Sequence, residues 1–152
     1  MSNLINISTQ ITGPLFSPDF LNNAIKESLA NSGAFLLTEL VILANNSRNA
    51  DNQPLQAYSR RALQLRAMAG LGSTPNFQFT SAMLNSLTIL KKSVNSFQIG
   101  VVGIDMNGMS NALKLQKTQQ IKNYYLLRAT PYLSKRVADF FESQLLSKLG
   151  GV

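Results

Sequence analysis

The chain has 152 residues, a formal net charge of +7, and neither histidine nor cysteine. This length fits one domain, and the missing side chains exclude disulfides, thiolate metal sites and the usual general base and thiol nucleophile. Apolar residues make up 45% of the chain, whereas charged residues make up 14%, against about 25% in typical globular domains. Two explanations of the low charge carry equal weight: much of the surface is covered by another subunit, or the source genome has a compositional bias.

The first sixteen residues are predicted to form an arm or irregular lead-in with a break at Thr12-Gly13-Pro14. Ser17-Pro18-Asp19 then predicts a helix start, because a hydroxyl cap, a proline at the first helical position and an acid suit a helix N-terminus. One apolar stripe follows, and Asn45-Asn46-Ser47 ends it: Leu21, Ile25, Leu29, Leu36, Leu40 and Leu43. Gly33 within the stripe predicts a close crossing or a bend.

The stretch 34–44 is too short to span a bilayer, and 1–10 is unlike a signal peptide. We therefore expect a cytosolic product without a membrane anchor. Residues 48–56 are predicted to form a turn-rich loop. A helix is predicted over 58–69, with Ala62, Leu65 and Met68 on one side, basic residues elsewhere and Gly70 as its C-terminal cap. A long loop is expected over 71–80.

From Met83 the pattern changes to a β-hairpin, with a first strand reaching Lys91-Lys92, a turn at 93–96 and a second strand over 97–104. A turn at 105–108 precedes a helix capped by Ser110 and ending near Lys122.

The segment 123–132 is predicted to be a strand followed by a loop at Pro131. Ser134 is expected to cap a final amphipathic helix that Gly150 closes, with an apolar side formed by Val137, Phe140, Phe141, Leu145 and Leu146. The predicted architecture is α+β: an arm over 1–16 and a single domain over 17–150 containing a long N-terminal helix, smaller helices and a small antiparallel sheet.

Little in the sequence supports catalysis, and the prediction is that the chain is not an enzyme and needs no cofactor or metal. Asp139 and Glu142 are the closest pair of acids, and such a pair on a helix is most often a solvated face. Glycines 100, 103 and 108 do not have the spacing of a phosphate-binding loop. Ser59, Ser93 and Ser134 are typical of turn and cap residues.

Positive charge is concentrated in the middle of the chain, where Asp105 is the one acid among eleven basic residues between Asn52 and Ala138. This asymmetry favours polyanions or acidic protein faces as neighbours. Tyr124 and Tyr125 could stack on bases, although structural packing of their rings is the favoured interpretation. Lys91 and Lys92 suit protection of a sheet edge and contact with an acidic partner equally. The candidate contact residues are Arg60, Arg61, Arg66, Lys91, Lys92, Lys122, Tyr124, Tyr125 and Arg128.

Several segments, in order over about residues 18–148, resemble the neck and tail-completion (head–tail joining) proteins of tailed bacteriophages and the related Mu-like virion morphogenesis and tail-component proteins. The long first helix is followed by DNQPLQAYSRR at 51–61, with its proline, tyrosine-serine pair and basic end. TSAMLNSL at 80–87 and QIGV at 98–101 are similar to the family's segments around the hairpin. RATPYL at 128–133 is similar to the segment before its closing helix.

The resemblance implies a structural protein of the virion neck or tail, made in the host cytoplasm. It implies a homo-oligomeric ring, six- or twelve-fold, that contacts portal or adaptor, tail terminator or tail-tube proteins. Its basic central region would meet acidic surfaces of these proteins or, without sequence specificity, the DNA in the channel. Tail completion, tail termination and head closure remain alternatives within this class. The runner-up prediction is a basic protein that binds nucleic acid without sequence specificity.

Overall fold

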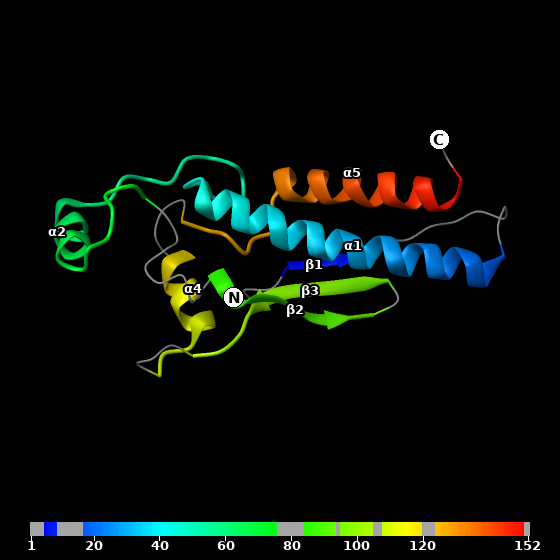
Figure 1. The fold of residues 1–152 in the computed structure, drawn as a ribbon, viewed down its shortest axis with the longest axis horizontal. Coiled ribbons are helices and arrows are strands. Elements are labelled where there is room, and N and C mark those ends of the chain that lie inside the picture. Colours follow the sequence, from blue (N-terminus) through cyan, green and yellow to red (C-terminus); the bar gives the residue numbers. More distant parts are fainter. Residues whose placement is uncertain are drawn as a thin grey trace.

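The computed structural model describes residues 5–8, 17–75, 84–93, 95–104, 108–119 and 124–150. Its elements are β1 (Ile5–Ser8), α1 (Pro18–Asn45), α2 (Arg60–Met68), β2 (Leu87–Lys92), β3 (Ser96–Val101), α4 (Asn111–Gln119) and α5 (Pro131–Lys148). Helix α1 lies between two layers, with α5 packed along one side and the sheet along the other (Figure 1). The predicted α+β class, with a long first helix and an antiparallel hairpin, is confirmed.

Helix α1 begins and ends where its flanking residues predict. The Ser17 hydroxyl accepts a hydrogen bond from the Phe20 backbone N–H at 3.3 Å, and Pro18 occupies the first turn. By length and composition α1 could cross a membrane, but half of its most apolar window is buried inside the protein. Contacts with the sheet and with α5 account for this burial, which is typical of the core helix of a globular domain.

Gly33 allows the hairpin to approach α1 closely. A Cβ atom at this position would lie 3.0 Å from Ile89 Cδ1 and 3.5 Å from the Phe97 ring. Carbon atoms rarely approach one another to 3.0 Å, so a side chain at position 33 would require the end of the Ile89 side chain to move by a few tenths of an ångström. The predicted close crossing at Gly33 is therefore confirmed.

The sheet has the order β1-β3-β2, with β3 antiparallel to both neighbours. Phe97, Ile99 and Val101 alternate along β3 and are all buried, as expected for one face of a strand packed on a helix. Ile5 pairs with Ile99. The prediction of an irregular arm is therefore wrong over Ile5–Ser8, which form a strand, and the rest of 1–16 lies outside the described residues.

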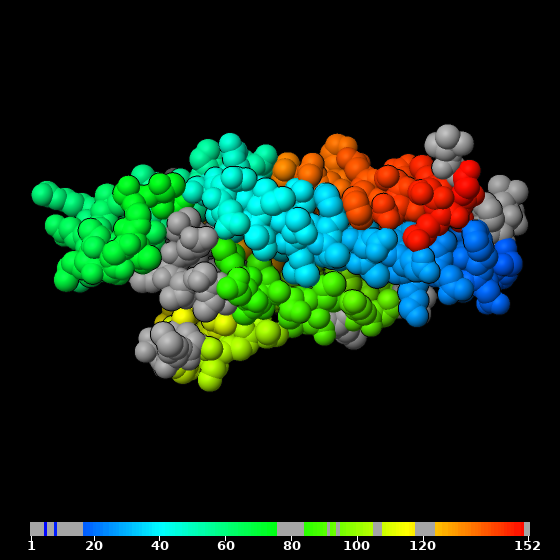
Figure 2. Space-filling model, in the orientation of Figure 1, coloured from blue at the N-terminus to red at the C-terminus, as the bar shows by residue number. Residues whose placement is uncertain are grey.

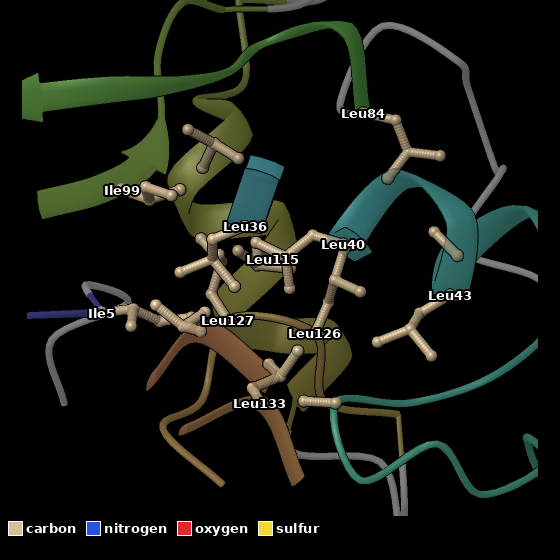
Figure 3. Close-up of a cluster of buried hydrophobic side chains, with 14 of the residues drawn as sticks. Ile5, Leu36, Leu40, Leu43, Leu84, Ile99, Leu115, Leu126, Leu127 and Leu133 are labelled. Atoms are coloured by element: carbon tan, nitrogen blue, oxygen red, sulfur yellow. The ribbon is translucent and has the colours of Figure 1, made fainter. Parts of the chain in front are cut away.

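The core is continuous across the three layers. Figure 3 shows Leu36, Leu40 and Leu43 of α1 gathered with side chains of the sheet, α4 and the segment before α5. Leu36, Leu40, Ile99 and Leu115 are completely buried. Each such side chain contributes about 1.5–3 kcal/mol of transfer free energy to folding.

The C-terminal elements differ from prediction in where α5 begins. The Thr130 hydroxyl accepts a hydrogen bond from the Leu133 backbone N–H at 3.2 Å, and Pro131 is the first residue of α5. Ser134 therefore lies inside the helix, and Pro131 starts a helix where a loop was expected. Residues 124–130 form no strand. Helix α4 follows Ser110 as predicted; its expected end at Lys122 and the turn residues 105–107 lie outside the described residues.

Candidate interaction surfaces

Helix α2 stands apart from the three layers. It extends from one end of the molecule on the loops that enter and leave it (Figures 1 and 2). Three of its apolar side chains face solvent, with exposed fractions of 36% for Leu63, 54% for Leu65 and 86% for Met68. An amphipathic helix normally turns such residues toward its own core. Here the apolar side is available to a partner.

Arg66 is the buried residue of α2, with 2% of its surface exposed. Its Nε–H donates a hydrogen bond of 2.8 Å to the Gly72 carbonyl, and its guanidinium carbon lies 4.6 Å from the centre of the Tyr58 ring. Both partners lie in the segments that flank α2. These contacts hold the helix against its own loops and leave Leu65 and Met68 outside.

Tyr124 connects the segment before α2 to the body of the protein. Its hydroxyl donates a 2.6 Å hydrogen bond to the Gln56 carbonyl, and its ring lies 6.1 Å from that of Tyr58. The side chain is buried, which raises its pKa to about 12. A base cannot stack on a ring enclosed in this way, so the structure supports the packing interpretation of Tyr124.

Tyr125 fastens the loop that follows α1. Its hydroxyl donates a hydrogen bond of 2.6 Å to Asp51 Oδ2, which raises the pKa of Tyr125, and the Arg128 guanidinium carbon lies 5.0 Å from the centre of its ring. The Thr130 hydroxyl adds a 2.7 Å bond to the Ala50 carbonyl. Tyr124 and Tyr125 therefore fix the loop 48–56 to the segment that precedes α5.

The predicted basic contact residues do not form one patch. Arg60 and Arg61 are exposed on α2, whereas Lys92 is exposed at the end of β2 next to the hairpin turn. This end of the sheet points away from α2 (Figure 1). Arg66 and Tyr124 are buried and leave the candidate surface. Lys122 lies outside the described residues, and only the backbone of Lys91 is described.

Sequence patterns missed Leu65 and Met68 as surface residues and Lys26 as a neighbour of the hairpin. Lys26 and Lys92 line the same cavity between α1 and the hairpin turn. The sequence signal for α2 is its short length between two loops. A helix this short is marginally stable by itself and depends on contacts outside it.

The acidic residues of α1 and α5 lie in two different settings. Asp139 and Glu142 are exposed, and Asp139 pairs with Lys135 at 2.9 Å. Glu39 instead joins α1 to α5, accepting hydrogen bonds of 2.7 Å from Nε and Nη2 of Arg136. Among the described residues, no three acids lie close enough together to hold a metal ion.

Comparison of the chain with protein-family models, curated proteins and solved structures found no match.

Proposed function

We propose that this protein is a homo-oligomeric structural component of a tailed-phage virion, a neck or tail-completion ring that joins the head to the tail. The observation that carries the proposal is α2, a helix held out from the body with Leu65 and Met68 exposed while Arg66 is buried beneath it. The resemblance of the ordered sequence segments to the phage family supplies the biological setting.

The physical argument concerns the apolar surface of α2. Covering a large apolar side chain yields about 1.5–3 kcal/mol, so Leu65 and Met68 would together supply a substantial part of a subunit contact. In a ring, each subunit offers one surface to the next and receives another from the previous one. Every contact is then repeated around the symmetry axis, and closure of the ring holds all of them together.

The test compares two changes of the same kind at different places. Leu65→Ser with Met68→Ser removes the apolar side of α2, whereas Leu146→Ser changes a leucine of similar exposure, 52%, on α5. Light scattering after size exclusion and negative-stain microscopy measure assembly. We expect rings from the wild type and from Leu146→Ser, and monomers from the double variant.

A wild-type protein that stays monomeric at all concentrations would contradict the proposed self-assembly. A double variant that assembles like the wild type would remove α2 from the interface. In the phage itself, loss of this protein should leave heads and tails unjoined, and normal particles without it would overturn the assignment to the neck.

A further inference from the structure

A cavity of about 200 Å³ opens between the N-terminal half of α1 and the end of the β2–β3 hairpin. Its apolar part comes from both elements, with Leu29 from α1 and Ile89 and Phe97 from the hairpin. Leu29 and Phe97 are buried. The cavity therefore has a fixed apolar floor that belongs to the protein core.

Two cations flank this floor. Lys26 of α1 and Lys92 of β2 line the cavity and are exposed, and neither makes an ion pair or a hydrogen bond within the described part of the chain. Glu27, the acid next to Lys26 in the sequence, pairs with Lys148 of α5. Two ammonium groups without an acidic partner among the described residues, beside an apolar surface, attract an anionic group that carries apolar atoms.

Ser93 and Ser96, at the ends of the two hairpin strands, are hydrogen-bonded to each other beside the cavity. The Ser93 backbone N–H donates a 2.8 Å hydrogen bond to the Ser96 carbonyl, and the two hydroxyls lie 2.5 Å apart. Both serines line the cavity. A mouth held in place in this way loses little conformational freedom when a partner binds.

The size of the cavity limits what it accepts. Pockets that enclose whole small molecules are commonly about 300–1,000 Å³, and this one is smaller. It has room for one or two protein side chains. A ligand that uses the whole site places an apolar side chain against the cavity floor and a neighbouring carboxylate between the two lysines.

We propose that this cavity is a docking site for a segment of a different protein that presents an apolar side chain next to a glutamate or aspartate. Charge favours such a partner over a second copy of this chain, which has only 7 acids against 14 basic residues. Glu27, Glu39, Asp51 and Asp139 of this chain already make ion pairs or hydrogen bonds. The proposal goes beyond the ring and does not depend on it.

The experiment uses the full chain and two blocked peptides, acetyl-Gly-Leu-Glu-Gly-amide and its Leu-Gln counterpart, with binding followed by saturation-transfer NMR. We expect the Glu peptide to bind with a weak, saturable affinity and the Gln peptide to bind about tenfold less well, since one charged contact is lost. Octanoate serves as a free amphiphilic carboxylate.

Three single variants separate the parts of the site. Lys26→Glu and Lys92→Glu should each weaken binding of the Glu peptide by about tenfold or more, because an attraction becomes a repulsion. Lys117→Glu, the same change at an exposed position on α4, should leave binding within about twofold. Ala30→Trp, at an exposed residue that lines the cavity, should block binding while both lysines remain.

Equal binding of the two peptides, or an equal loss in Lys117→Glu, would overturn the proposal. Octanoate binding more tightly than the Glu peptide would reassign the site to a lipid-like ligand and would also overturn it. A peptide copied from this chain's own acidic segment 139–142 that outcompetes the Glu peptide would do the same. Assembly measured in these samples separates the two proposals, since the cavity variants should form rings like the wild type.

Discussion

Arg66 and Tyr124, two large side chains that end in polar groups, are buried where α2 joins the body of the protein. Burying a polar group is costly unless it finds a hydrogen-bond partner, and both have a backbone carbonyl as acceptor, at Gly72 and Gln56. The guanidinium group of Arg66 and the ring of Tyr124 both lie against the ring of Tyr58. Arg66 and Tyr124 therefore stabilise the fold through packing and through a hydrogen bond each, which explains why neither is available for contact with a partner.

Tyr124 should make stability depend on pH in the alkaline range. Its pKa in the folded protein is about 12, above the ordinary tyrosine value of about 10, so the folded state holds the proton more tightly than the unfolded state. This contribution is fully present below pH 10 and is lost as the pH rises toward 12, by at most about 1.4 kcal/mol per pH unit.

Tyr124→Phe tests this directly, because phenylalanine keeps the ring and removes the proton. We expect the variant to lose about 1 kcal/mol near neutral pH, the value of its hydrogen bond to the Gln56 carbonyl. The difference between the two proteins should then shrink above pH 10 and change sign before pH 12, because the titration is worth more than the hydrogen bond. Urea unfolding at a series of pH values measures it, and a constant difference would show that Tyr124 does not titrate in this range.

Among the helices, α2 is held by contacts with the two segments that flank it, and no face of it packs along another of the described helices. Its buried contacts run from Arg66 to Tyr58 and to Gly72, in the two flanking segments. Elements with few buried apolar contacts open locally at a lower free energy than the global unfolding of the domain. The base contacts therefore decide whether α2 is formed.

Arg66→Ala should release α2 while leaving the three-layer body folded. We expect backbone amides of 60–68 to exchange hydrogen much faster than in the wild type, whereas protection in α1 and β3 changes little. Hydrogen-exchange mass spectrometry resolves these segments. Arg61→Ala, at an exposed arginine of the same helix, is the control and should change neither. Equal loss of protection in α1 would show that α2 and the core unfold together.

The two long helices show which element boundaries a sequence can predict. Ser17-Pro18 and Thr130-Pro131 are the same signal, a hydroxyl cap followed by proline, and the structure uses both. The first was interpreted correctly because an apolar stripe follows it at once. The second was missed because Ser134, four residues later, offers an equally suitable hydroxyl, and sequence alone does not decide between adjacent caps.

For the whole molecule, the distribution of charge bears on the runner-up function of nonspecific nucleic-acid binding. Arg60 and Arg61 lie on α2, away from Lys92 at the hairpin (Figure 1). Because each phosphate contact contributes a slope of about −0.9 in a plot of log affinity against log salt, we expect a shallow slope of magnitude about 3 or less for duplex DNA.

Fluorescence anisotropy of a labelled duplex in rising salt measures this slope. The Leu65→Ser, Met68→Ser variant belongs in the same series, so that assembly does not multiply the contacts. A slope of magnitude about 6 or more in the variant would require many phosphate contacts per chain and would favour the nucleic-acid function.

The sequence by itself determined the α+β class, the extent of α1 and the hairpin, and it limited Gly33 to a close crossing or a bend, of which the structure shows the crossing. These follow from local signals: apolar period, caps, turns and a glycine. Tertiary structure decided that Ile5–Ser8 join the sheet, that Arg66 and Tyr124 are buried, and that Lys26 and Lys92 line one cavity. Each depends on which residues distant in the chain meet in space, and no local pattern contains that information.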